Sequence, residues 1–111
     1  MKRAEVWTLQ DDDYAAKPRP VVIVQGDLDD YDSVILCLLT SLDRPASATR
    51  VAVEPDANNG LRKTSYVMTE KLLTVRKSRL GVHVGILTDE CMSAVSRSLA
   101  GVLAITKEDF D

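Results

Sequence analysis

Histidine and cysteine are scarce in this sequence, with one histidine and two cysteines among 111 residues. His83 has no cysteine or second histidine at a spacing suited to metal binding or nucleophilic catalysis, so an exposed or structural strand residue is the simpler interpretation. Cys37 lies in an apolar run and Cys91 in a helical pattern, and we expect two small buried hydrophobes rather than a disulfide. The sequence therefore predicts no metal site and no cofactor.

A long hydrophobic run and a net positive charge are also missing. No apolar stretch approaches the roughly 18 residues of a membrane span, and no signal-peptide core follows the N-terminus, so we expect a cytoplasmic protein without a membrane partner. The net charge of −3 and the pI of about 5.1 exclude nucleic-acid binding through an overall basic field. Any RNA affinity must come from a local cluster such as Lys17 with Arg19, although a single basic cluster is more simply a solvated face.

Acidic residues crowd the segment 27–32, which invites a calcium interpretation. An EF-hand loop beginning at Asp27 would need glycine at its sixth position and glutamate at its twelfth, where this chain has Asp32 and Leu38. We therefore expect a surface turn that keeps the neighbouring strands soluble.

Aromatic residues make up only 5% of the chain, so the core must be built mainly from Val, Leu and Ile, which suit pleated strands. Alternating or continuous apolar segments, separated by turn signals, predict a series of short strands. An Asn58-Asn59-Gly60 turn is expected to reverse the chain between two of them. The predicted strands are 5–9, 21–25, 33–40, 49–54, 66–68 with 72–75 continuing or following it, and 81–87.

One helix is predicted after the strands. Thr88 is a candidate N-cap, because acidic residues suited to the positive end of a helix dipole follow it. Apolar residues then recur at three- and four-residue spacing to about residue 104, namely Met92, Val95, Leu99, Val102 and Leu103. The fold class is therefore mainly β with a C-terminal helix, a small bent antiparallel sheet or barrel in a single domain over residues 1–111 with a frayed tail at 106–111.

Arg19 and Thr40 are the most informative polar residues. Prolines on both sides of Arg19 hold its backbone extended at a strand entrance, and its guanidinium is a fork of donors suited to phosphate. Thr40 and Ser41 close the apolar strand 33–40, so pairing it with the preceding strand would bring a hydroxyl near Arg19. A surface ion pair and a turn cap are the structural alternatives.

Several blocks of the sequence, in order and over residues 3 to about 104, resemble the MazF/PemK family of toxins from bacterial toxin–antitoxin pairs. Those blocks are Arg3-Ala4-Glu5-Val6-Trp7, Arg19-Pro20-Val21-Val22, Thr40-Ser41, Val53-Glu54-Pro55 with Asn59-Gly60-Leu61, Leu72-Leu73-Thr74-Val75, and Lys77-Ser78-Arg79-Leu80-Gly81.

The resemblance implies an SH3-like β-barrel with a C-terminal helix, and a homodimer whose RNA groove is covered by a MazE-like antitoxin. It implies a metal-independent endoribonuclease that cuts single-stranded RNA, with Arg19 and Thr40 as the catalytic pair. The expected substrate-binding residues are Lys17, Ser41, Gln25 and Glu70.

A guanidinium is an implausible general base, so Glu70, solvent or the substrate itself could take that role. An exposed strand carboxylate is the alternative interpretation of Glu70. The main alternative function is a toxin of the same fold that inhibits DNA gyrase without cutting RNA. This chain departs from the family pattern in its first loop, residues 10–17, and at Lys71, where relatives carry Gln. We expect these departures to affect base preference rather than the catalytic pair.

Overall fold

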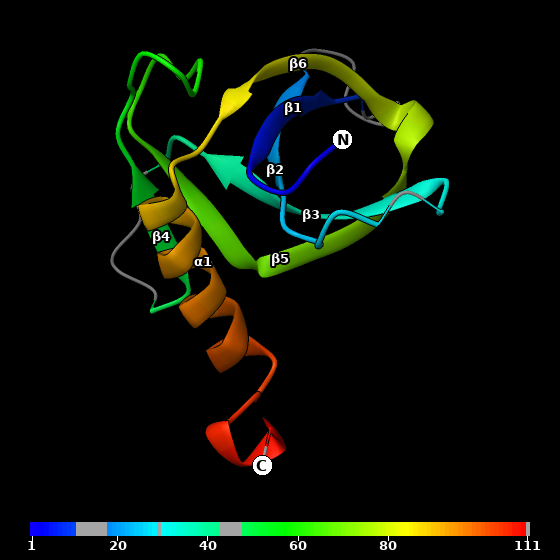
Figure 1. Cartoon of the computed structure of the whole chain (residues 1–111). Coiled ribbons are helices and arrows are strands. Elements are labelled where there is room, and N and C mark those ends of the chain that lie inside the picture. The colour runs from blue at the N-terminus through cyan, green and yellow to red at the C-terminus, as the bar shows by residue number, and fades with distance from the viewer. Residues whose placement is uncertain (11–17, 29, 43–47, 111) are drawn as a thin grey trace.

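The structure, a computed structural model, describes residues 1–10, 18–28, 30–42 and 48–110. Within these residues, six β-strands precede a single α-helix, and two short 3-10 turns complete the fold (Figure 1). The elements are β1 (Glu5–Leu9), β2 (Arg19–Ile23), β3 (Ser33–Thr40), β4 (Arg50–Val53), β5 (Ser65–Arg76), η1 (Lys77–Arg79), β6 (Leu80–Ile86), α1 (Asp89–Val102) and η2 (Lys107–Phe110).

The strands form one antiparallel sheet in the order β4-β5-β3-β2-β1-β6. The mainly β fold with a C-terminal helix is confirmed, and β1 and β3 have the predicted bounds. Strand β2 begins at Arg19, two residues earlier than predicted, because the extended backbone imposed by Pro20 already fits the ladder with β1. The sheet is strongly curved, as an SH3-like barrel requires (Figure 1).

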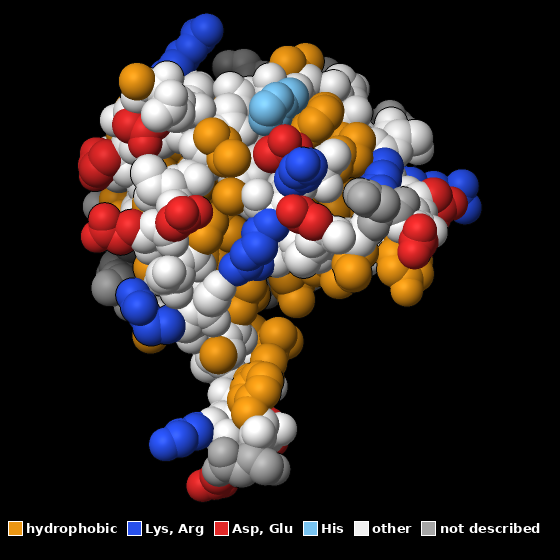
Figure 2. All heavy atoms as spheres, viewed as in Figure 1, with side chains coloured by type: hydrophobic (Ala, Val, Ile, Leu, Met, Phe, Trp, Pro, Cys, Tyr) orange, Lys and Arg blue, Asp and Glu red, His pale blue; other side chains and the backbone are white. Residues whose placement is uncertain are grey.

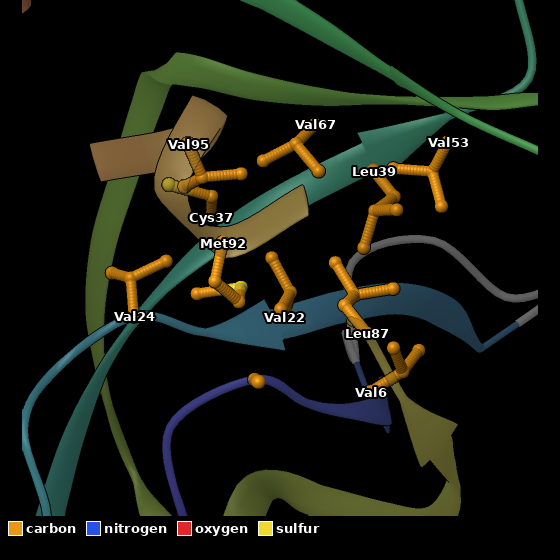
Figure 3. Close-up of a cluster of buried hydrophobic side chains, with 11 residues drawn as sticks. Val6, Val22, Val24, Cys37, Leu39, Val53, Val67, Leu87, Met92 and Val95 are labelled. Carbon is orange, nitrogen blue, oxygen red and sulfur yellow. The ribbon is translucent and has the colours of Figure 1, made fainter. Parts of the chain in front are cut away.

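Both faces of β2 are buried, so the sheet packs a hydrophobic cluster on each side. Val22 and Val24 point toward Met92 and Val95 of α1 (Figure 3). The same cluster also contains residues of β1, β3, β4 and β5. The opposite face contributes Val21 and Ile23 to a second cluster built from β1, β3 and β6. Because apolar atoms are removed from water on both sides, β2 is stabilised by burial on both faces, and with its neighbour β3 it positions the site described below.

Strand β5 is a single twelve-residue strand with a pronounced bulge. Leu38 of β3 pairs with Met68, whereas the adjacent Cys37 pairs with Leu72, which leaves residues 69–71 without partners in β3. The buried Thr69 hydroxyl bonds the Thr49 carbonyl at 2.5 Å, which anchors the bulge. A bulge bends its strand, and β5 turns a corner across the sheet (Figure 1). The two apolar segments read from the sequence are thus one continuous, bent strand.

The predicted reversal at 58–60 is present between β4 and β5. Gly60 has φ of +69°, the left-handed conformation that glycine adopts without strain. Asn59 is fully buried, and its side chain donates to the Glu54 carbonyl at 2.9 Å and accepts from the Leu61 amide at 3.0 Å. The turn is therefore held by a satisfied buried amide rather than by hydrophobic contacts.

This turn lies directly against the end of β6, which explains why a glycine is needed there. The Ile86 amide donates to the Asn58 carbonyl at 3.0 Å, and a Cβ on Gly85 would lie 2.4 Å from the same carbonyl oxygen. In the structure, Gly85 permits a close backbone approach that brings the β4–β5 connection to the opposite edge strand (Figure 1).

We expect Gly85→Ala to destabilise the protein by about 1–3 kcal/mol, because the added methyl would have to displace backbone atoms rather than a flexible side chain. Thermal or urea unfolding followed by circular dichroism measures this. Gly101→Ala is the matched control, since nothing lies within 4 Å of its added Cβ and alanine favours the helix by about 0.5–1 kcal/mol. Equal unfolding midpoints for the two variants would contradict the close approach.

Helix α1 begins as predicted, with the Thr88 hydroxyl accepting a hydrogen bond from the Cys91 amide at 3.1 Å. Its apolar face is only partly used, because Met92 and Val95 are buried whereas Val102 and Leu103 are exposed. The helix runs past the sheet, and hydrophobic side chains gather on the projecting C-terminal end (Figure 2).

The segment expected to be a frayed tail contains the 3-10 turn Lys107–Phe110, whose residues are all exposed. The Thr106 amide donates to the Asp109 carboxylate at 2.7 Å, a local bond that supports the turn. No helix among the described residues is long and apolar enough to cross a membrane.

Cys37 is buried and Cys91 partly buried, and neither forms a disulfide. Burial, with a smaller effect from the charge of Glu70, raises the pKa of the Cys37 thiol to about 11, so it stays protonated and acts as a small hydrophobe. His83 is an exposed strand residue whose ring lies 5.2 Å from that of Trp7. The predicted structural roles of Cys37 and His83 are thus confirmed.

Candidate active site

Two adjoining hollows open at the end of the sheet where β2 begins and β3 ends. Their volumes are about 320 Å³ and 330 Å³, and Arg19, Thr40, Leu42 and Met68 line both of them. We refer to the two hollows together as the Arg19 cleft. The Arg19 guanidinium and the Thr40 hydroxyl thus lie on one concave surface, together with the apolar side chains of Leu42 and Met68.

Strand pairing explains why Arg19 and Thr40 meet. Val21 pairs with Leu38 in the antiparallel ladder of β2 and β3, and continuing that register by two residues places Arg19 opposite Thr40. Residues at the same rim of an antiparallel pair project side chains that can reach a common ligand. The structure therefore brings together the two residues that the sequence singled out.

The hydroxyls of the cleft have distinct environments. Thr40 Oγ1 accepts a hydrogen bond from the Leu42 amide at 3.1 Å, so it does cap the turn that follows β3. A hydroxyl has two lone pairs and one O–H, and this cap uses one lone pair, which fixes the oxygen while leaving the O–H to donate. Ser41 is exposed and lines one of the two hollows. Turn capping and ligand binding are compatible at Thr40.

Glu70 lies beside the cleft in an ionic network with β4. Its carboxylate accepts from Thr49 Oγ1 at 2.9 Å and pairs with Arg50 Nη2 at 3.2 Å. Partial burial acts to raise the pKa of Glu70, but the hydrogen bonds from Thr49, from its own backbone and from Arg50, together with the Arg50 charge, hold that pKa below its usual value. A carboxylate bonded in this way is a weak proton acceptor, which supports a positioning role more than that of a general base.

Gln25, one of the predicted substrate-binding residues, is not among the described residues that line the Arg19 cleft. Gln25 follows the far end of β2, where its side chain accepts a hydrogen bond from the Ile35 amide at 3.1 Å. Its observed contact is structural, because it fixes the β2–β3 connection. Lys17 lies outside the described residues.

Arg50 and Lys71 line the second hollow together with Arg19, and sequence reasoning did not identify them as site residues. Lys71 had a signal, since it replaces a glutamine of the family pattern. Arg50 had none, because only the pairing of β4 with β5 brings it beside Glu70.

Comparisons with known proteins assign the chain to a family. The sequence profile of the PemK-like, MazF-like toxins of type II toxin–antitoxin systems matches residues 2–103. The chain belongs to this family. The "probable endoribonuclease MazF" of Mycolicibacterium smegmatis is 36% identical over 107 residues, which cover 95% of this chain and 98% of the relative.

Solved structures of MazF toxins have the same fold. A mycobacterial endoribonuclease solved in complex with its cognate antitoxin superposes with a TM-score of 0.81 and 25% identity, covering 96% of this chain and 97% of the other. The Mycobacterium tuberculosis toxin MazF-mt6 gives a TM-score of 0.77 and 25% identity, covering 92% and 98%. A MazE–MazF complex from Deinococcus radiodurans, at 14% identity and a TM-score of 0.77, shares the fold.

These MazF relatives do not support the gyrase-inhibitor alternative, because they are named as endoribonucleases or MazF toxins. In the described part of the chain, no group of three or more His, Cys, Asp or Glu side chains is placed to hold a metal ion.

Proposed function

We propose that this toxin is an endoribonuclease that cuts single-stranded RNA without a metal ion, with the scissile phosphate bound in the Arg19 cleft. The single observation that carries the site assignment is the lining of one cleft by both Arg19 and Thr40, at the adjacent ends of β2 and β3. The activity is supported by the Mycolicibacterium smegmatis relative, which is named as a probable endoribonuclease and matches nearly the whole chain.

The reaction fits these two side chains. The 2′-hydroxyl of the nucleotide attacks the adjacent phosphorus, the bond from phosphorus to the leaving 5′-oxygen breaks, and that oxygen takes up a proton. Negative charge builds on the phosphoryl oxygens during the attack, and a fixed guanidinium stabilises it at close range. The Thr40 O–H can donate to one of those oxygens and keep the phosphate in line. The attack needs no bound metal, because the nucleophile belongs to the substrate.

Arg19 is assigned no proton transfer in this scheme, because a guanidinium has donors and no acceptor. The lowered pKa of Glu70 and its pairing with Arg50 make it a poor base in the observed arrangement. We therefore assign removal of the 2′ proton to water or to a substrate oxygen. The role that we assign to Glu70 is to position Arg50. Ser41 lies in the hollow beside Thr40, where it can contact the substrate.

The proposed assembly is a cytoplasmic homodimer that is held inactive by a MazE-like antitoxin. It is supported by neighbouring structures in which an endoribonuclease is bound to its cognate antitoxin and MazF is bound to MazE. Base selection would come from contacts beyond the phosphate, since phosphate contacts fix position without reading sequence.

We expect the purified toxin to cleave single-stranded RNA at an unchanged rate when excess EDTA is added. Gel analysis of a defined transcript measures the rate, and sequencing the 5′ ends of the products gives the recognised bases. A metal-dependent ribonuclease assayed in parallel is the control for effective chelation. Loss of activity in EDTA that is restored by a divalent cation would refute the metal-free reaction, and absence of cleavage in all conditions would refute the proposed function.

A further inference from the structure

A second cationic feature adjoins Arg19 and Thr40. The hollow that they share with Leu38, Leu42 and Met68 is completed by Arg50 and Lys71. Its lining in the described part of the chain holds three cationic side chains and no carboxylate. In a protein with a net charge of −3, that is a local concentration of positive charge.

Arg50 is held firmly at this position. It opens β4, its side chain is only 20% exposed, and Glu70 pairs with Nη2 at 3.2 Å. Thr49 fixes the other oxygen of the same carboxylate at 2.9 Å. The Arg50 Nε is buried and has no hydrogen-bond partner among the described residues, whereas part of the side chain stays exposed and lines the hollow. A cation restrained in this way loses little side-chain entropy when it binds an anion.

Lys71 is placed by the bulge of β5. It is the last of the three residues without partners in β3, and it is exposed. Lysine binds phosphate as a mobile point charge on a long stem, which suits a flexible single strand. Lys71 thus adds a cation from the bulge of β5 to the lining of the cleft.

We propose that Arg50 and Lys71 form a second phosphate subsite, which binds a backbone phosphate next to the scissile one. This inference rests on the proposed function, because it assumes that RNA occupies the Arg19 cleft. The ligand is an RNA phosphodiester, an anion that repeats along the strand, so a strand bound at Arg19 carries a neighbouring phosphate within the same cleft. The subsite contributes to binding and register and touches no reacting atom.

The test compares Lys71→Gln with the wild-type toxin on an oligonucleotide that contains its mapped cleavage site. We expect KM to rise about 5-fold with kcat within twofold of wild type. The dependence of log KM on log salt concentration should become shallower by about 0.7, the slope of one phosphate contact to a single strand. Lys71→Arg should restore most of the affinity. Lys107→Gln removes the same charge from the distant C-terminal turn and should change neither quantity.

Arg50 is tested separately, because removing it alone would leave Glu70 unpaired. The double variant Arg50→Gln with Glu70→Gln keeps the net charge of the region unchanged. A rise in KM and a shallower salt slope in this variant would support a direct contact of Arg50 with phosphate. A wild-type KM would mean that Arg50 only neutralises Glu70, and would overturn its part in the subsite.

Failure of the subsite can be told apart from failure of the proposed function. If the wild-type toxin neither cuts nor binds single-stranded RNA, the function itself is wrong. If the wild type cuts RNA and Lys71→Gln shows the same KM and the same salt slope, the cleavage site stands and the second phosphate subsite is overturned. A fall in kcat at constant KM would also overturn it, since it would place Lys71 in the chemical step.

Discussion

Replacing Arg19 with alanine is expected to lower the cleavage rate by about 10²- to 10³-fold, the loss typical of removing one preorganised donor to a developing oxyanion. The structural cost should be small, because Arg19 is exposed at the first position of β2 and contributes no apolar core contact. Single-turnover cleavage of a defined RNA measures the loss, and circular dichroism with size-exclusion chromatography checks the fold and the assembly.

Arg76→Ala is the matched control for this variant. Arg76 is also an exposed strand arginine, but it pairs with Ser33, at the opposite end of β3 from Thr40. Its removal changes the overall charge by the same amount and should leave the rate nearly unchanged. Thr40→Val should give a smaller loss than Arg19→Ala. Wild-type cleavage by a folded Arg19→Ala variant would remove Arg19 from the site.

A single deoxynucleotide at the scissile position of the RNA is expected to abolish cleavage at that bond. The proposed nucleophile is the 2′-hydroxyl, and the described residues that line the Arg19 cleft include no carboxylate or histidine that could activate water in its place. The measurement is cleavage of two oligonucleotides that differ only in that hydroxyl. Binding should change little, so the deoxy oligonucleotide should compete with the natural one.

The matched substrate control carries the deoxynucleotide at a position remote from the recognised bases and should be cut normally. Cleavage of the oligonucleotide that lacks the scissile 2′-hydroxyl, or of the corresponding all-DNA strand, would rule out attack by the substrate and require a different nucleophile.

The features that the sequence predicted best are those that local chemistry determines. Strand β3 has its predicted bounds because an uninterrupted apolar run ends in a hydroxyl. The helix begins at the expected cap because the Thr88 side chain accepts from the Cys91 amide and acidic residues occupy the first turn, features that are local in the sequence. The meeting of Arg19 and Thr40 followed from pairing two adjacent strands, so the centre of the candidate site was predictable as well.

The features that the sequence did not reveal depend on contacts between distant segments. No residue type or local pattern in the sequence marks the bulge in β5. The bulge brings Lys71 to the cleft only because β3 and β4 pair with β5 on either side. The resemblance implied that Gln25 binds substrate, yet its side-chain amide accepts a hydrogen bond from the Ile35 amide at the far end of β2. Gly85 is required by its close approach to Asn58 and Asn59, which lie in a distant turn earlier in the chain, a relation that no local pattern encodes.

The unpaired residues of β5 also limit how this chain can change its length. Side chains along a strand alternate between the two faces of the sheet. Deleting one residue from 69–71 would therefore move each side chain in the following half of β5 to the opposite face. Val75 would then face solvent, and a neighbouring polar side chain would enter the second hydrophobic cluster. We expect the fold to tolerate substitutions of the exposed Lys71, while single-residue insertions and deletions at this corner are lost. Toxins of this family should therefore differ in the side chains at the positions that correspond to residues 69–71, but not in the number of residues between the two halves of the strand.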